Sequence, residues 1–236
     1  MDGAMGSRGA CLFEPYTDAP EQSGLLVWKE EDFVAYLQRI RKAGLQAACH
    51  AIGDKANHIV LNAYEKVDAK GLRFRIEHAQ ILAKDDIKRF AKLEVIASMQ
   101  PLHMLADMPW IEKRIGKERI PCAFAFRSLL AAGAKIAGGS DSPIVDINPL
   151  MGIYAATTHQ ESHIGECISR KEALKMYTLD AAYASFREHE LGSITKGKLA
   201  DLVILPENIL TCPADALRTM PVLYTIVNGK VCYKKA

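Results

Sequence analysis

Length, composition and charge describe a globular chain and argue against several classes of protein. The 236 residues fit one large domain, or one domain with a small appendage, and can bury a substantial core without disulfide or metal staples. Hydrophobic residues make up 49% and charged residues 25%, which is typical of soluble domains and argues against a disordered or fibrous chain. The formal net charge is only +2, and no apolar run reaches the roughly 18 residues of a membrane span. We therefore expect neither nucleic acid nor a membrane as a partner.

The cysteines and the first residues indicate a reducing compartment. Six cysteines are spread along the chain and include no Cys-x-x-Cys pair, so free thiols are the simplest interpretation. The opening residues show no basic segment followed by an apolar one, the pattern that directs export. We expect a cytoplasmic protein.

Short apolar runs alternate with helical periodicity from about residue 30 to residue 185, which predicts βα units. Strands are predicted at 45–50, 74–78, 95–99 and 134–138. Helices are predicted at 31–42, about 54–70, 85–93, 121–132, 149–158 and 170–185. The stretch before residue 121, which contains Trp110, is expected to be irregular. This alternation is typical of a parallel sheet flanked by helices, so the predicted fold class is α/β.

The pattern becomes rich in β-prone residues beyond Gly192. Apolar runs at 202–205, 222–227 and 230–233 predict three strands, and Asn228-Gly229 between the last two is a strong hairpin signal. We therefore divide the chain into an α/β part, residues 1–191, and a small β appendage, residues 192–236.

Polar side chains stand where each of the four predicted parallel strands ends. His50 closes the first strand, His78 closes the second, His103 follows the third, and Asp141 follows the fourth. Barrels and open parallel sheets place their active sites at this edge. Each residue alone has an ordinary interpretation, such as a hydrogen-bonded histidine or a turn aspartate, but the four together favour a site. Histidine nitrogen with aspartate oxygen is a ligand set suited to zinc.

The other four histidines lack such a placement. His58 lies inside a predicted helix, whereas His159, His163 and His189 lie in polar loops or turns. We expect all four on the surface, without a catalytic role.

Five segments resemble the amidohydrolase superfamily. They are His50–Ala56 (HAIGDKA), Arg75–Gln80 (RIEHAQ), Ser98–His103 (SMQPLH), Gly139–Pro143 (GSDSP) and Gly197–Leu202 (GKLADL). They are similar to the branch that includes N-substituted formamide deformylase and the exoenzyme-regulator-like hydrolases. Residues 2–9 (DGAMGSRG) are similar to the loop after the fourth barrel strand in that branch. The resemblance spans practically the whole chain.

The resemblance implies the C-terminal part of a (β/α)8 TIM-barrel metallohydrolase with a small β-sandwich appendage. Residues 1–191 would form about strands five to eight of the barrel, and residues 192–236 a segment of the sandwich. The resemblance also implies a role for individual residues: metal ligation for His50, His78 and Asp141, a catalytic proton transfer for Asp141, and an approach to the substrate for His103. Arg8 and Trp110 are further candidate substrate contacts, with a surface and a core role as their alternatives.

The chain departs from the family pattern at the metal site. It contains no His-x-His pair, which family members carry at the end of the first strand, and it lacks the bridging group near the fourth. We therefore expect a piece of a longer enzyme with an incomplete site for a divalent metal, zinc by its ligand types.

The implied activity is hydrolysis of a non-peptide carbon-nitrogen bond in a small-molecule amide, formamide or cyclic amide. The alternative is a truncated, non-catalytic remnant, or an assembly half that needs an N-terminal half or further copies of itself. A nucleotide-binding protein is disfavoured, because no glycine-rich phosphate loop follows any predicted strand.

Overall fold

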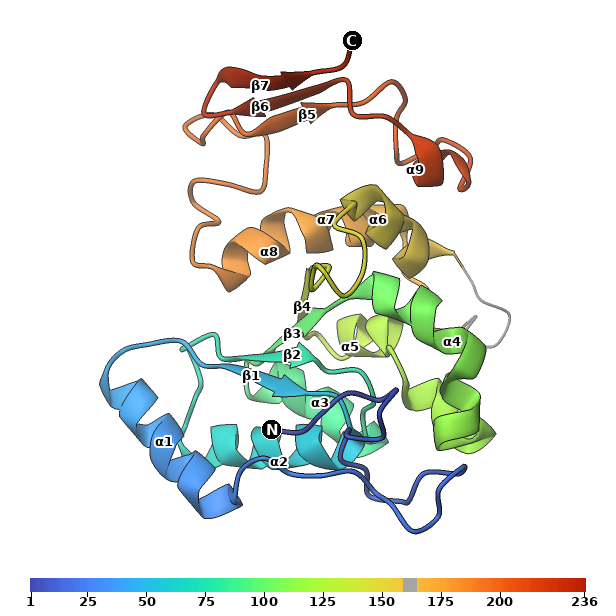
Figure 1. The fold of residues 1–236 in the computed structure, drawn as a ribbon. Coiled ribbons are helices and arrows are strands. Elements are labelled where there is room, and N and C mark those ends of the chain that lie inside the picture. Colours follow the sequence, from blue (N-terminus) through green and yellow to red (C-terminus); the bar gives the residue numbers. More distant parts are fainter. Residues whose placement is uncertain (159–164) are drawn as a thin grey trace.

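A four-stranded parallel sheet forms the centre of the protein (Figure 1). The computed structural model describes residues 1–158 and 165–236. The strands are β1 (Ala48–Ala51), β2 (Arg75–His78), β3 (Ile96–Met99) and β4 (Lys135–Gly138). Each strand pairs with the next one along the chain, in the spatial order β1-β2-β3-β4. All four carboxyl ends therefore meet at one edge, as the alternating pattern predicts.

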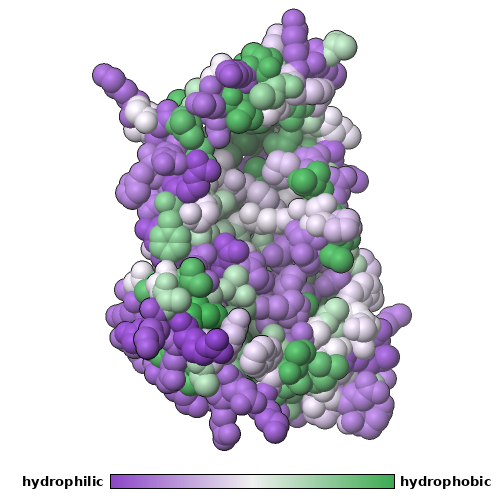
Figure 2. Space-filling view, turned by 60° about the vertical axis from the view of Figure 1, so that its left-hand side comes forward, coloured by the Kyte–Doolittle hydropathy of each residue, from purple (hydrophilic) through white to green (hydrophobic). Residues whose placement is uncertain are grey.

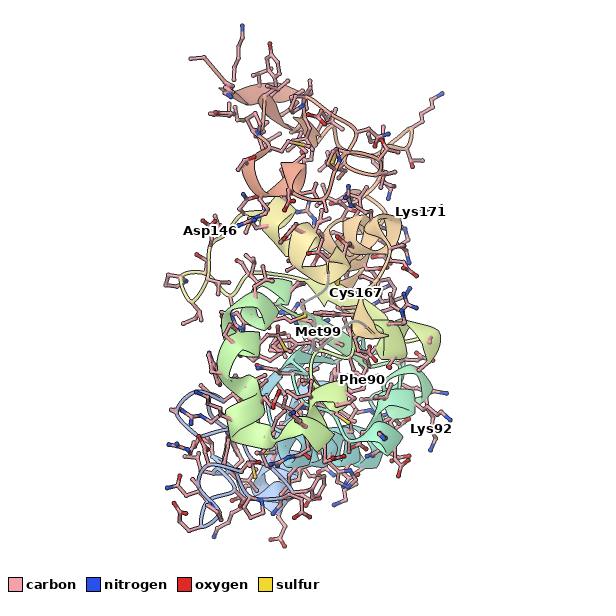
Figure 3. The ribbon with its side chains drawn as sticks, turned by 90° about the vertical axis from the view of Figure 1, so that its right-hand side faces the viewer. Phe90, Lys92, Met99, Asp146, Cys167 and Lys171 are labelled. Atoms are coloured by element: carbon pink, nitrogen blue, oxygen red, sulfur yellow. The ribbon has the colours of Figure 1, made fainter. Side chains whose placement is uncertain are left out.

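A layer of helices covers one face of this sheet. It contains α1 (Glu30–Lys42), α2 (Asp54–Lys66), α3 (Lys84–Lys92) and α5 (Phe126–Ala131), which pack side by side in that order. Their apolar residues recur at helical spacing, so one side of each helix is buried. On α3, for example, Phe90 is fully buried while Lys92 extends into solvent (Figure 3).

The stretch around Trp110 is helical, and the prediction of an irregular segment was wrong. Helix α4 runs from Pro101 to Ile115 and is followed by the 3-10 helix η1 (Lys117–Cys122). Proline is favoured in the first turn of a helix, where its missing N–H has no partner to lose. The buried residues recur at intervals of three and four: Met104, Met108, Ile111 and Ile115. The internal Pro109 obscured that period, because proline usually disrupts a helix.

Three helices separate the parallel sheet from the C-terminal strands (Figure 1). They are α6 (Pro149–Thr157), α7 (Arg170–Tyr177) and α8 (Leu179–Ala184). The single helix predicted at 170–185 is broken at Thr178, whose φ of −124° and ψ of −89° lie outside the helical region. Both α7 and α8 pack on β4, so the break lets the chain follow the edge of the sheet.

The C-terminal residues form a separate antiparallel sheet. It consists of β5 (Leu202–Ile204), β6 (Tyr224–Val227) and β7 (Lys230–Lys234), with the short helix α9 (Ala216–Thr219) between β5 and β6. Asn228 and Gly229 have positive φ values of 48° and 76°, as the predicted hairpin turn requires. Hydrophobic residues are visible on its surface at the top of Figure 2. The domain boundary at residues 191/192 stays a prediction.

Within residues 1–158 and 165–236, no helix has both the length and the apolar character needed to cross a membrane.

Candidate metal centre

Two imidazoles and one carboxylate converge at the carboxyl edge of the parallel sheet. His78 ends β2, His103 lies in the first turn of α4, and Asp141 follows β4. Each offers one ligand atom, and these atoms all lie within 4.8 Å of one another. The rings of His78 and His103 stack at 5.7 Å, and His103 Nε2 lies 3.9 Å from Asp141 Oδ2. Side chains from three strand ends therefore meet at a point that could hold one ion.

His50 lies beside this group at the end of β1. Its ring centre is 4.6 Å from that of His78, in an edge-on arrangement. All four residues singled out at the strand ends thus lie on the same edge, although the compact group of three contains His103 rather than His50. Metal ligation by His50 and substrate contact by His103 stay predictions.

Asp2 supports His50, a contact that no local sequence pattern indicates. Its carboxylate is fully buried and accepts hydrogen bonds from the backbone N–H groups of Cys11 (2.9 Å), Ile52 (3.0 Å) and Gly53 (2.8 Å). The other contact of Asp2 Oδ1 is His50 Nδ1, at 3.1 Å. When Nδ1–H donates to Asp2, the lone pair of His50 lies on Nε2, which is the arrangement that fixes many metal-binding imidazoles.

Asp2 can reach the loop after β1 because Gly53 leaves room for the segment of residues 1–11. A Cβ on Gly53 would lie only 2.0 Å from the carbonyl oxygen of Cys11, far inside van der Waals contact. Any other residue would push the segment away from the sheet. The backbone nitrogen of Met1 donates to the carbonyl of His50 at 2.7 Å, which also holds this segment against β1.

The two histidines of the group are kept neutral. Burial, reinforced by the nearby His50 and His103, lowers the pKa of His78 to about 4. Burial also lowers the pKa of His103, although Asp141 acts in the opposite direction. Neutral imidazoles carry the free lone pair that a metal requires.

Unpartnered nitrogen atoms show that these residues fit a metal ion. Among the residues that the structure describes, His78 Nδ1 and His103 Nε2 are buried without a hydrogen-bond partner. Buried polar atoms in proteins nearly always have a partner, so an exception calls for an ion, a water or a ligand. Two such nitrogens beside a carboxylate are a donor set suited to zinc.

The backbone of His78 and of Asp141 has an unusual, positive φ angle. His78 has a φ of 76°, the following Ala79 a φ of 44°, and Asp141 a φ of 57°. Residues other than glycine seldom adopt positive φ, and such strain often occurs at functional sites. Positive φ takes the backbone of His78 and Asp141 out of the extended strand conformation.

The group faces a cavity of about 480 Å3. The lining residues combine imidazoles, two carboxylates and an apolar wall: Ala4, Met5, Gly6, His50, Ile52, His78, Gln80, His103, Ala106, Asp107, Trp110, Asp141, Ile144 and Val145. Trp110, a predicted substrate contact, is among them, whereas Arg8 is not. The Arg8 guanidinium instead donates to Asp18, with distances of 3.1 and 3.2 Å.

Gln80 and Asp107 are cavity residues that the sequence interpretation missed. Gln80 was part of a family-like motif without a role of its own, and Asp107 lay in the stretch that was expected to be irregular. A helical prediction for that stretch would have placed Asp107 on the same face as His103, four residues away.

The other two histidines that the structure describes lie away from this cavity. His58 is partly exposed, and its Nδ1 is 2.9 Å from Asp86 Oδ2; His189 is largely exposed. His159 and His163 lie outside the described residues.

Comparison with known proteins assigns the chain to a family. The profile of the amidohydrolase family matches residues 1–233. The chain is 36% identical to amidohydrolase YtcJ of Bacillus subtilis, covering 100% of this chain and 46% of that protein. It is 32% identical to N-substituted formamide deformylase of Arthrobacter pascens, covering 84% of this chain and 38% of that enzyme. It thus spans less than half of the length of these relatives.

A solved structure gives the same result. The chain superposes on an uncharacterized metal-dependent hydrolase from Pyrococcus furiosus with a TM-score of 0.82 and 38% identity, covering 89% of this chain and 44% of that one. This similarity confirms the predicted fold class, part of an α/β barrel of the amidohydrolase type. The resemblance noted in the motifs is likewise confirmed: the chain belongs to the amidohydrolase family.

Proposed function

We propose that the chain supplies part of the active site of a metal-dependent hydrolase that cleaves a non-peptide carbon-nitrogen bond in a small-molecule amide, formamide or cyclic amide. The observation that carries the proposal is the group of His78, His103 and Asp141, whose ligand atoms lie within 4.8 Å of one another. The likeness to N-substituted formamide deformylase supports the type of bond.

Two ligand sets are compatible with these residues. The resemblance favours His50, His78 and Asp141, whereas the distances favour His78, His103 and Asp141. Both sets contain His78 and Asp141. A divalent metal held there, zinc by its ligand types, would acidify a water molecule and polarise the scissile carbonyl.

Asp141 is the residue proposed to move the proton. Its side chain is 44% exposed and lines the cavity, so a carboxylate oxygen can reach a water molecule there. It would accept the proton of the attacking water and then donate it to the leaving nitrogen, as a general base followed by a general acid. The neutral His78 and His103 keep their lone pairs free for the metal and would not compete for that proton.

The alternative is a non-catalytic remnant or an assembly half. It is supported by the short coverage of the relatives, 46% and 38% of their lengths, and by the lack of a His-x-His pair. In that case a partner, either an N-terminal half or another copy of the chain, would complete the set of metal ligands.

The cysteines bear on the location of the protein. All six are free, which supports the proposal of a reducing, cytoplasmic location.

A zinc titration combined with an activity assay tests these possibilities. The wild-type chain and its His78→Ala and Asp141→Asn variants would be titrated with zinc against a chromophoric chelator, then assayed on N-formyl and N-acyl amines. We expect one zinc per chain, lost in His78→Ala, and little hydrolysis by the chain alone. Robust turnover that Asp141→Asn abolishes would reject the remnant alternative. Failure of the wild-type chain to bind zinc would reject the proposal.

A further inference from the structure

A second carboxylate faces the cavity at a distance from the candidate metal group. Asp107 lies on α4, four residues after His103, and both side chains line the cavity. Residues four apart lie on the same face of a helix, one turn away, with Cβ atoms about 6 Å apart. Asp107 is therefore close enough to contact the same small molecule, but it is not part of the group of three ligands.

Asp107 has only one hydrogen-bond donor among the described residues. Gln80 Nε2 donates to Asp107 Oδ2 at 2.7 Å. Gln80 is only 2% exposed, and its backbone carbonyl accepts the backbone N–H of Phe124 at 2.7 Å, so the main chain that carries this donor is itself hydrogen-bonded. Within the same described ranges, Asp107 Oδ1 accepts no hydrogen bond, and the carboxylate forms no ion pair.

The charge of Asp107 lacks compensation. The cavity lining contains two carboxylates and no lysine or arginine, and Asp141 belongs to the candidate metal group. Burial raises the pKa of Asp107 to about 6, so the group still carries its charge at neutral pH. A partly buried charge without an opposite charge beside it is unfavourable, and a cation relieves that cost.

The surroundings of Asp107 define what kind of cation would fit. Trp110 lies three residues further along α4 and lines the same cavity, together with the buried Met5. An aromatic face attracts an organic cation and also packs against its carbon atoms. A hydrated metal ion would gain nothing from this apolar wall, whereas a protonated amine on a hydrocarbon group would gain from both features.

We propose that Asp107, held by Gln80 and flanked by Trp110, is a subsite for a protonated amine of the substrate. The inference rests on the proposed function, in which the carbon-nitrogen bond is cleaved at the candidate metal group. It narrows the class of substrate. The preferred substrates would be amides that carry an ammonium group on a short apolar linker, with that group about one helical turn from the bond to be cleaved.

Two probes of matched shape and different charge test the subsite. Phenethylammonium is a cation at pH 7.5, and 2-phenylethanol is its neutral counterpart. Each would be titrated into the 15N-labelled chain while the indole signal of Trp110, assigned with Trp110→Phe, is followed. We expect at least tenfold tighter binding of the cation to the wild-type chain.

Two variants assign the preference to one carboxylate. In Asp107→Asn the preference should fall below about twofold, while Gln80 can still donate to the amide oxygen and keep the local shape. Asp85→Asn removes an equal charge from an exposed position in the first turn of α3 and should leave the preference unchanged.

The outcomes separate this proposal from the proposed function. A preference that survives Asp107→Asn, or a wild-type chain that binds both probes equally or neither, would overturn the ammonium subsite. Zinc uptake would be measured on the same samples. Normal zinc uptake without a charge preference contradicts the subsite alone, whereas a clear preference without zinc uptake contradicts only the metal-dependent function.

Discussion

The two sides of the cavity differ in how completely their polar groups are hydrogen-bonded. On the β1 side, Asp2 accepts three backbone N–H groups and contacts His50 Nδ1. On the α4 side, His103 Nε2 has no hydrogen-bond partner among the described residues, and Asp107 has one. Satisfied buried groups fix a conformation, while unsatisfied ones carry an unfavourable free energy that a ligand can remove. The β1 side therefore has the properties of a support, and the α4 side those of a binding surface.

The largest effect that this comparison predicts is on stability, from Asp2→Ala. The substitution leaves three backbone N–H groups without their acceptor, so we expect the free energy of unfolding to fall by about 3 to 5 kcal/mol. Urea unfolding followed by circular dichroism measures this change. The control is Asp18→Ala, which removes surface ion pairs to Arg8 and Arg114 and should cost less than about 1 kcal/mol. Equal losses in the two variants would contradict a supporting role for Asp2.

A second, smaller effect concerns zinc, and Asp2→Asn decides whether His50 is a ligand. An amide keeps the shape of Asp2 but cannot accept hydrogen bonds on both of its terminal atoms. Loss of such a support typically weakens metal binding about 10- to 100-fold, so we expect a decrease of that size by competition titration if His50 ligates. Unchanged affinity in Asp2→Asn, together with a strong loss in His103→Ala, would assign the metal to His78, His103 and Asp141 alone.

On the α4 side, Asp107→Asn should raise the free energy of unfolding, whereas Asp2→Ala should lower it. Burial raises the pKa of Asp107 from 3.8 to about 6, so the folded chain holds this proton more tightly than the unfolded chain. The stability contributed by the wild-type residue therefore falls as the pH rises between about 4 and 6. Each pKa unit corresponds to about 1.4 kcal/mol. Allowing for solvent in the cavity, we expect Asp107→Asn to gain about 2 kcal/mol at pH 8.

The pH dependence provides the check on this gain. Urea unfolding at pH 4 should show little difference between wild type and Asp107→Asn, because the carboxyl group is then mostly protonated in the folded chain. His50, His78, His103 and Asp141 face the same cavity and are present in both proteins, so their titration largely cancels in the difference. If Asp107→Asn is less stable than the wild type at pH 8, the charge of Asp107 is compensated in the folded chain, contrary to this prediction.

The strand-end residues were predictable from the sequence because of a simple geometric rule. Parallel strands that pair in chain order bring their carboxyl ends to one edge, so His50, His78, His103 and Asp141 had to lie on the same side of the sheet once the strands were recognised. The hairpin at Asn228-Gly229 followed from turn chemistry in the same way. Local patterns were sufficient for these features because each is encoded within a few residues.

Asp2 and Asp107 could not be found in this way, for two different reasons. Asp2 contacts a residue 48 positions away, and no local pattern identifies a partner at that separation. Asp107 lies on a helix whose apolar period is interrupted by Pro109, so its face was not recognised. The two residues that local patterns could not identify, Asp2 and Asp107, are thus the ones that distinguish the two sides of the cavity.

The smallest expected effect comes from Gln80→Met, which removes the hydrogen bond to Asp107 while keeping a side chain of similar length. Hydrogen bonds to a charged group are worth about 1.5 to 3 kcal/mol when well formed, and this bond favours the ionised carboxylate. Its loss should raise the pKa of Asp107 further, by about one unit, as measured by 13C NMR titration of the carboxyl carbon and compared with the exposed Asp85 as an internal control. The shift would also extend to higher pH the range in which the protonated carboxyl no longer attracts a cation. If the pKa of Asp107 stays constant or falls in Gln80→Met, then a donor other than Gln80 holds the carboxylate, and the contrast between the two sides of the cavity is smaller than the hydrogen bonds indicate.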